Sequence, residues 1–287
     1  MILSNLIYCT ITMALLFTTQ TLYADQHVKK VRIYNTVKQK LLDGKSVVGG
    51  TVYTNDPDVY CAMANSGFDF LWIEMQHSPL MYNEVARMIW ACKDAPAIPF
   101  IRVPDATESD LQKATDIGAL GIVVPMVDTV EETERAVLYS KYPPLGRRSR
   151  GGGQYGALWG NDYRETANDN IMLVIMLETP VAIANAAKIA AVPGVDVVFA
   201  ASGDIASFTG YERSDERYKV LIKKIHDRVL SAGKILGGPY SWKDRPGYTF
   251  FQGPSEAALI KSGTTVTLSN TQAPEKNEDV ATGDEPQ

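Results

Sequence analysis

Short apolar segments recur along the chain, separated by stretches that carry helix signals. The apolar segments show little alternation with polar residues, which is typical of strands buried on both faces of a parallel sheet. They predict eight strands, at residues 47–52, 70–73, 100–103, 121–124, 171–175, 195–199, 234–236 and 248–251. Strands that alternate with helices in this way predict the α/β class.

The stretches between the strands begin with N-cap and proline signals. These signals lie at Asp56-Pro57, Thr107 with Asp110, Thr129 with Glu132, and Thr179-Pro180. An apolar stripe at helical spacing predicts a further helix, packed on the sheet, at Val85, Met88, Ile89 and Cys92. Residues 240–247 leave little room for a seventh helix, and the segment after Gly253 predicts only a short last one.

A single-domain, closed (β/α)8 TIM barrel accommodates these elements best. Residues 25–270 are close in number to the ~250 residues of such a barrel. An open, doubly wound sheet is the alternative. That fold would carry G-x-G-x-x-G after its first strand for a dinucleotide, and the chain has only Gly49-Gly50 there.

The two ends of the chain differ from its body. Residues 1–24 contain no Asp, Glu, Lys or Arg, and Ala24 is a small residue at the expected cleavage point. This predicts a cleavable signal peptide and an exported, periplasmic or secreted protein; a retained N-terminal anchor and a mistaken start codon are the alternatives. Residues 271–287 are polar, acidic and without aromatic side chains, which predicts a disordered tail after the barrel at 25–270.

Charge and cysteine content exclude several classes of protein. The formal net charge is −5, of which the tail carries −4, so the body lacks the basic face that a nucleic-acid-binding protein needs. The cysteines, Cys9, Cys61 and Cys92, form no CxxC or Cys/His cluster, which argues against a zinc site. We expect Cys61 and Cys92 to be buried free thiols, with a disulfide between them as the alternative in an oxidising compartment.

Two carboxylates fall at the ends of consecutive predicted strands. Glu178 ends the fifth strand and Asp204 lies just past the sixth. A barrel would place them side by side at its C-terminal mouth. Adjacent carboxylates suit Mg²⁺ or Mn²⁺, although strand-end acids serve about as often in salt bridges or helix caps.

Three more polar residues lie at neighbouring strand ends. His77 follows the second strand, three residues after Glu74, whose carboxylate can orient an imidazole and raise its basicity. Arg102 lies in the apolar third strand, where a guanidinium requires an anionic partner such as a substrate carboxylate or a developing oxyanion. A loop histidine taken alone is more often structural.

The connection between the fourth and fifth predicted strands is unusually long. After a helix it runs through Tyr142-Pro143-Pro144 and a basic, glycine-rich stretch from Arg147 to Gly156. Long irregular loops at barrel ends are commonly functional. A loop that only packs against a neighbouring subunit is the alternative.

Taken together, these motifs resemble the HpcH/HpaI aldolase family, the metal-dependent class II pyruvate aldolases typified by 4-hydroxy-2-oxoheptane-1,7-dioate aldolase. The motifs are Gly67-Phe68-Asp69-Phe70 with His77-Ser78-Pro79, Ile101-Arg102-Val103-Pro104, Asp116-Ile117-Gly118-Ala119 with Val124-Pro125-Met126-Val127, Tyr142-Pro143-Pro144-Leu145-Gly146 with Arg148, Leu177-Glu178-Thr179, and Gly194-Val195-Asp196 leading to Gly203-Asp204. The resemblance covers residues 35–269, and its specificity lies in the order of the motifs.

The resemblance implies a divalent-metal-dependent carbon–carbon lyase. Glu178 and Asp204 would bind the metal, Mg²⁺ or Mn²⁺, with Co²⁺ as a further candidate. The reaction would cleave a 4-hydroxy-2-oxo acid to pyruvate, or a close analogue, and an aldehyde through a metal-bound enolate. Backbone N–H groups at Gly203 and Asp204 would hold the substrate carboxylate.

The resemblance also assigns the remaining roles. Arg102 would stabilise the enolate oxygen, and His77, paired with Glu74, would act as acid and base. The terminal helix of this family commonly holds an oligomer together, so we expect a homo-oligomer with a small-molecule substrate. Neither nucleic acid nor a stable membrane span is expected.

The chain departs from the family pattern in its pocket. Gln76 stands where an acidic residue usually precedes the histidine, and Met176 stands where a glutamine usually lies two residues before the metal-binding glutamate. These departures, together with the predicted export, motivate a rival interpretation, a non-catalytic oxo-acid-binding barrel. A related citrate-lyase-like enolate enzyme is a further alternative.

Overall fold

The computed structural model describes residues 31–271. The chain divides into two units, Met1–Arg32 and Ile33–Gln287. Only Val31 and Arg32 of the first unit are described, and all elements below belong to the second. The predicted leader at 1–24 lies outside the described residues, as does the predicted tail apart from Thr271.

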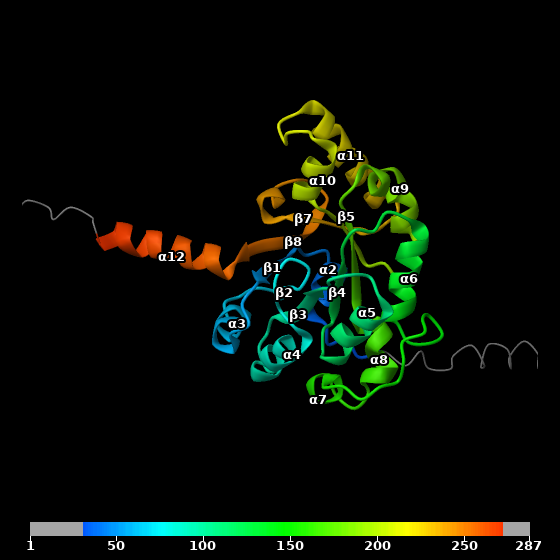
Figure 1. The fold of residues 1–287 in the computed structure, drawn as a ribbon, viewed down its shortest axis with the longest axis vertical. Helices are drawn as coiled ribbons and strands as arrows, with labels where there is room; N and C mark the ends of the chain where they lie inside the picture. Colours follow the sequence, from blue (N-terminus) through cyan, green and yellow to red (C-terminus); the bar gives the residue numbers. More distant parts are fainter. Residues whose placement is uncertain (1–30, 272–287) are drawn as a thin grey trace, which may run out of the picture. The chain divides into compact units, whose positions relative to one another are not determined.

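Eight parallel strands form a closed barrel in the order β1-β2-β3-β4-β5-β6-β7-β8 (Figure 1). The strands are β1 Val47–Val52, β2 Phe70–Glu74, β3 Ile98–Arg102, β4 Gly121–Val124, β5 Met172–Leu177, β6 Val197–Ala200, β7 Ile235–Pro239 and β8 Tyr248–Ser255. Each of the eight predicted segments overlaps one of these strands. The barrel prediction is confirmed, and the open sheet is excluded.

Helices join the strands around the outside of the barrel, one further helix precedes the first strand, and another follows the last strand (Figure 1). They are α2 Thr36–Leu42, α3 Pro57–Ala64, α4 Tyr82–Ala91, α5 Glu108–Asp116, α6 Val130–Ser140, α7 Tyr155–Trp159, α8 Tyr163–Asn170, α9 Pro180–Ala191, α10 Ser202–Thr209, α11 Glu216–Ser231 and α12 Glu256–Thr271. The predicted N-caps form, because the side chains of Asp56, Thr107, Thr129 and Thr179 accept backbone N–H groups of the first turns.

Aromatic rings fill the interior of the barrel. Phe70 lies 4.7 Å from Phe100 and 4.6 Å from Phe250, measured between ring centroids. Because β3 and β8 are not neighbouring strands, the Phe100–Phe250 contact at 5.8 Å crosses the interior. Gly49 and Gly121 pair in register with Phe70 and Phe100, and a Cβ at either glycine would collide with the ring. The glycines therefore provide the space that the rings occupy.

Cys61 and Cys92 form a disulfide, so the expectation of two free thiols is wrong. Cys61 lies in α3, and Cys92 directly follows α4. These helices are neighbours on the outside of the barrel, which brings the two Cα atoms within 5.5 Å. Both residues are half-buried, and the bond joins one barrel helix covalently to the next.

The long connection after α6 lies at the N-terminal end of the barrel. Gln154 Nε2 donates to the carbonyl oxygen of Ile117 at 2.6 Å, and Trp159 Nε1 donates to that of Gly118 at 2.9 Å. Both acceptors lie between the end of α5 and the start of β4. The loop therefore covers the end of the barrel opposite to the mouth at which the strands end.

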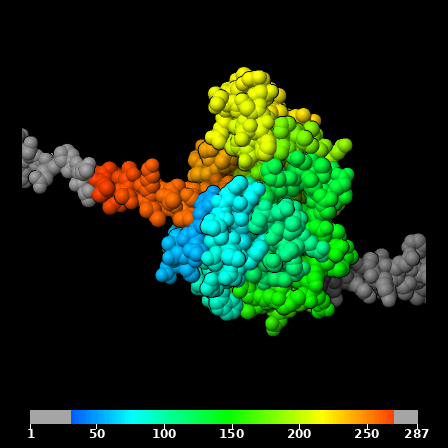
Figure 2. Space-filling model, in the orientation of Figure 1, coloured from blue at the N-terminus to red at the C-terminus, as the bar shows by residue number. Residues whose placement is uncertain are grey.

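Two elements near the C-terminus depart from a regular barrel. Only a short 3₁₀ turn, η1 Tyr240–Trp242, joins β7 to β8, as the sequence predicts. Helix α12 has 16 residues, so the expectation of a short last helix is wrong. It extends away from the barrel, and its side chains from residue 260 to 269 are exposed (Figure 2). Among the described helices, none is long and apolar enough to span a membrane.

Candidate active site

Four of the predicted site residues come from strand ends at one mouth of the barrel. Glu74 and Arg102 are the last residues of β2 and β3, and they are direct partners in the register of the sheet. Glu178 follows the last residue of β5, and Asp204 lies in the first turn of α10, after β6. Because all strands are parallel, these residues share the C-terminal end of the barrel.

Arg102 joins two buried acids. Its Nη1 lies 3.3 Å from Glu74 Oε2, and its Nη2 lies 3.0 Å from Glu178 Oε1. The arginine is 6% exposed, and the two acids are 0% and 1% exposed. Removal of this guanidinium would leave two buried carboxylates without a compensating positive charge. The Nε atom of Arg102 is also buried and makes no hydrogen bond within residues 31–271.

Glu178 is held by the backbone as well as by Arg102. Its Oε2 accepts the N–H of Met126, just after β4, and Met126 adopts a left-handed conformation with φ of 56°. That conformation is uncommon for a residue with a side chain. Burial raises the pKa of Glu178 to about 7; the Met126 N–H and Arg102 oppose this rise, and Asp204 and Glu74 add to it.

Glu74 contacts the backbone of His77 and not its ring. Glu74 Oε1 accepts the N–H groups of Gln76 and His77, at 3.0 and 3.1 Å, and Oε2 accepts the indole N–H of Trp72 at 3.2 Å. The His77 side chain is exposed, and its imidazole makes no hydrogen bond within the described part of the chain. The structure thus places Glu74 beneath the loop that carries His77, without the expected contact between carboxylate and imidazole.

Asp204 opens onto a cavity of about 310 Å³ at this mouth. Its carboxylate is half-buried and has no hydrogen-bond or ion-pair partner among the described residues. The cavity is lined by Tyr53, Arg102, Met176, Phe199, Ala201, Ser202, Gly203, Asp204, Arg213, Pro239, Ser241, Trp242 and Gln252. His77 is absent from this lining. Asp204 and Arg102 therefore border the same cavity.

Several lining residues were missed by reasoning from the sequence. Tyr53 follows β1, Trp242 lies in η1, and Arg213 comes from the loop between α10 and α11. None carries a local motif, and only the position of Tyr53 after a predicted strand could have indicated it. Met176, noted for its departure from the family pattern, is 2% exposed and places an apolar side chain in the wall.

The acids at the mouth fit a divalent cation held by two protein ligands. Glu178 and Asp204 follow neighbouring strands, β5 and β6. The carboxylate of Asp204 has no cationic partner among the described residues, and its negative charge contributes to the raised pKa of Glu178. Within residues 31–271 no group of three or more His, Cys, Asp or Glu side chains is placed to hold a metal. Two carboxylates with water and substrate in the other positions is a usual arrangement for Mg²⁺.

A closed parallel barrel with a buried guanidinium and three carboxylates at its C-terminal mouth is typical of a TIM-barrel enzyme. Residues 52–241 match the family model described as HpcH/HpaI aldolase/citrate lyase. The chain belongs to this family, as its motifs predict, and it is a carbon–carbon lyase of the aldolase type.

Individual relatives match over most of their length. The 2-dehydro-3,6-dideoxy-6-sulfogluconate aldolase of Pseudomonas putida is 31% identical over 232 residues, which cover 75% of this chain and 89% of that protein. The 2-keto-3-deoxy-L-rhamnonate aldolase of Klebsiella pneumoniae subsp. pneumoniae is 32% identical over 210 residues, 71% of this chain and 78% of that one. A family protein of known structure from Burkholderia cenocepacia superimposes with a TM-score of 0.76 at 24% identity, covering 83% of this chain and 100% of that one. This structural similarity supports the assignment of the fold.

Proposed function

We propose that this protein is a divalent-metal-dependent aldolase that cleaves a 4-hydroxy-2-oxo acid to pyruvate, or a close analogue, and an aldehyde. The observation that carries the proposal is the position of Arg102. Its guanidinium is buried between Glu74 and Glu178 and borders the cavity that Asp204 faces. A fixed positive charge there stabilises negative charge that develops on a substrate oxygen.

The chain supplies groups for each part of the substrate. The N–H groups at the start of α10, at Gly203 and Asp204, suit the carboxylate of the oxo acid, since the N-terminus of a helix favours an anion. Arg102 suits the ketone oxygen, which becomes an enolate oxygen as the C3–C4 bond breaks. These contacts fix the 2-oxo acid end of the substrate and leave its C4 end toward the wider cavity.

His77 remains our candidate for the acid and base. A base takes the proton of the 4-hydroxyl, the C3–C4 electrons move to the enolate, and the aldehyde carbonyl forms at C4. The same proton then returns to C3 and gives the methyl group of pyruvate. Because the His77 ring is exposed and does not line the cavity, we propose that this proton passes through water.

Glu178 and Asp204 would hold the divalent cation, with Mg²⁺ or Mn²⁺ as the candidates and Co²⁺ after them. The bound cation supplies Lewis-acid polarisation of the ketone. Glu178 must be ionised to bind it, and a cation at this position compensates the mutual repulsion of the two carboxylates.

The experiment is release of pyruvate from a panel of 4-hydroxy-2-oxo acids with Mg²⁺, Mn²⁺, Co²⁺ or EDTA. We expect Glu178→Ala to lose both metal binding and turnover, and His77→Ala to keep metal binding and lower kcat by about 10²-fold. Glu216→Ala removes an exposed carboxylate that pairs with Lys219, and it is the matched control.

The outcomes separate the alternatives. If His77→Ala turns over as fast as the parent, the acid and base assignment is wrong. Metal-dependent binding of pyruvate or oxalate without any cleavage would instead favour the oxo-acid-binding barrel. Cleavage restricted to citrate-like substrates would favour the citrate-lyase-like enzyme.

We also propose that the protein works in an oxidising compartment, in the periplasm or outside the cell. The disulfide between Cys61 and Cys92 supports this proposal, because disulfides persist where thiols are not kept reduced. Mass spectrometry of the protein from its native cells tests it. We expect a chain that begins at Asp25 and lacks free thiols; a chain that retains residues 1–24 and in which Cys61 and Cys92 are both alkylated would overturn it.

A homo-oligomer completes the proposal. Helix α12 exposes Ile260, Val266 and Leu268 at 64%, 56% and 56%. A helix that extends from its own barrel buries such side chains only against another molecule. We therefore propose that α12 contributes to contacts between copies of the chain.

A further inference from the structure

A second cavity lies at the end of the barrel opposite to the active site. It measures about 510 Å³, and we call it the arginine pocket; it is lined by Tyr142, Pro143, Arg148, Arg150, Arg164 and Glu165. These residues belong to the long connection between α6 and β5, which lies at the N-terminal end of the barrel. Three of the lining residues are arginines and one is acidic, so the wall is predominantly cationic.

Arg148 is fully enclosed in the wall of the arginine pocket. Its Nη2 lies 2.7 Å from Asp116 Oδ1, and its Nη1 donates to the Tyr163 hydroxyl at 2.9 Å. The guanidinium carbon lies 4.5 Å from the ring centroid of Tyr142 and 5.4 Å from that of Tyr155. The residue is 3% exposed, and its Nε is buried without a hydrogen-bond partner in the described chain.

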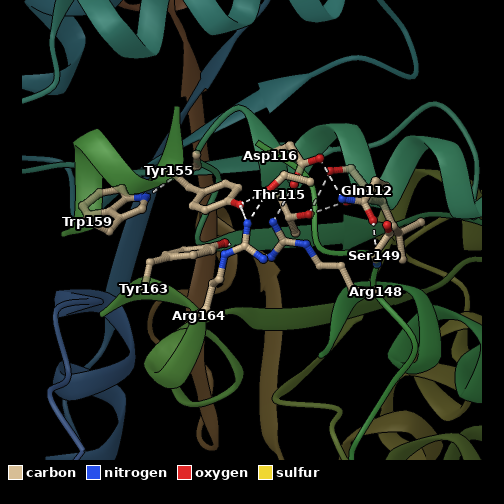
Figure 3. A network of polar contacts seen from close by, with 12 residues as sticks. Gln112, Thr115, Asp116, Arg148, Ser149, Tyr155, Trp159, Tyr163 and Arg164 are labelled. Carbon is tan, nitrogen blue, oxygen red and sulfur yellow. Dashed lines mark hydrogen bonds and ion pairs between the residues drawn. The ribbon is translucent and has the colours of Figure 1, made fainter. Parts of the chain in front are cut away.

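Arg164 approaches the same aromatic ring. Its guanidinium carbon lies 5.8 Å from the Tyr155 ring centroid, and its Nη2 donates to the Tyr155 hydroxyl at 2.9 Å and to the carbonyl of Gly151. Its Nη1 is buried and makes no hydrogen bond within residues 31–271, and no carboxylate in that range pairs with it. Figure 3 shows the guanidinium groups of Arg148 and Arg164 beside each other.

The charges at this pocket are incompletely compensated. Asp116 neutralises Arg148, whereas Arg164 and the exposed Arg150 have no ion-pair partner in the described part of the chain. Two like charges around one ring repel each other. An anion in the pocket would compensate the positive charges of Arg150 and Arg164.

We propose that the arginine pocket binds a phosphorylated small molecule. A phosphoryl group carries up to two negative charges and three acceptor oxygens, and guanidinium groups bind it through paired N–H donors. A carboxylate would meet only part of this donor set. The volume exceeds that of a free phosphate, so the remainder of the ligand would lie along Tyr142 and Pro143. The site is separate from the proposed chemistry at the other end of the barrel.

The experiment measures binding of inorganic phosphate and of ribose 5-phosphate to the full chain by calorimetry. EDTA is present throughout, so that a metal at the catalytic mouth does not contribute, and sodium acetate at equal ionic strength is the reference anion. We expect ribose 5-phosphate to bind more tightly than phosphate, and acetate not to compete. Tighter binding of inorganic phosphate would assign the pocket to free phosphate and correct the ligand.

Variants locate the binding. We expect Arg164→Gln to weaken binding about tenfold, since it removes a charge-assisted pair of donors, and Arg150→Gln to weaken it a few-fold. Arg147→Gln is the matched control, because Arg147 lies in the same loop, pairs with the exposed Glu108 at 3.2 Å and does not line the pocket. Its affinity should equal that of the parent.

Two results would overturn the proposal. One is the absence of binding of either phosphate compound to the parent chain. The other is a loss in Arg147→Gln as large as that in Arg150→Gln or Arg164→Gln, which would indicate general charge attraction. If Arg164→Gln does not fold, the comparison of Arg150→Gln with Arg147→Gln decides between these outcomes.

Discussion

At the scale of single residues, Arg102 uses two different nitrogen atoms to hold acids from two different strands. Lysine carries all its donors on one nitrogen and lacks the planar fork, so it does not reproduce the two separate contacts to Glu74 and Glu178. We predict that Arg102→Lys lowers kcat for pyruvate release by about 10²-fold with the fold retained. Steady-state kinetics and circular dichroism measure this. Arg147→Lys, at an exposed arginine, should keep the parental kcat, and a parental kcat in Arg102→Lys would contradict the role.

Lys141 gives a prediction for how the free energy of unfolding depends on pH. Its ammonium is buried and donates to the carbonyls of Asn168 and Ile171. Burial lowers the pKa of Lys141 from its ordinary 10.5 to about 8, although the charge of Asp196 opposes this. Between these two pH values the unfolded chain binds more protons at this group than the folded chain does. The contribution of Lys141 to the free energy of unfolding therefore rises with pH in that window.

We predict that Lys141→Met removes this pH dependence. The free energy of unfolding of the parent should rise relative to that of the variant by about 2–3 kcal/mol between pH 7.5 and pH 10. Urea unfolding at both pH values measures the difference, and the comparison cancels other groups that titrate in the same range. A difference that stays constant with pH would show that the lysine is charged throughout.

Reasoning from the sequence identifies the charged residues at the strand ends but misses loop residues that line the cavity. Glu74, Arg102 and Glu178 stand out because a charged residue at the end of an apolar strand is expected at the C-terminal mouth of a barrel. The ion pairs among these three residues do not follow from their positions in the sequence, because the same positions would also allow Arg102 to point into the cavity without contacting either acid. Tyr53 and Arg213 come from loops, whose course depends on the packing of elements far away in the sequence.

At the scale of elements, the strands were predictable because they are buried on both faces and are therefore apolar throughout. The length of α12 was not predictable in the same way. Its sequence contains Gly263 and several threonines, which have low helix propensity, and it lacks a continuous apolar stripe. The bond between Cys61 and Cys92 was only the alternative expectation, because the spacing of the cysteines does not show whether their side chains face each other on neighbouring helices.

The disulfide gives a prediction for stability. It closes a loop with a sequence separation of 31 residues, which corresponds to about 3–4 kcal/mol in the chain-entropy model. We predict that Cys61→Ser with Cys92→Ser lowers the free energy of unfolding by about this amount. Urea unfolding with and without reductant measures it: the parent should lose stability on reduction, whereas the double variant should not respond. Equal midpoints for the reduced and oxidised parent would contradict the prediction.

At the scale of the whole molecule, α12 is the helix whose side chains do not pack against the barrel over most of its length. Its first residue is anchored, since Glu256 Oε1 accepts the N–H groups of Tyr53 and Thr54 at 3.0 and 2.9 Å. We predict that a chain ending at Glu256 keeps its barrel and forms a smaller assembly than a chain ending at Thr271. Analytical ultracentrifugation compares the two. Equal sedimentation of both chains would show that α12 plays no part in assembly.

The sector between β7 and β8 has a consequence for how the cavity admits its ligand. Only η1 joins these strands, and Gly237 and Gly238 contribute no side chains to the packing of β7. Trp242 closes the gap, with its ring 5.2 Å from that of Tyr248. Segments with few packed side chains open locally at low free energy. Since Trp242 also lines the catalytic cavity, we expect a local opening of this sector to change the shape of the cavity and with it the access of a ligand.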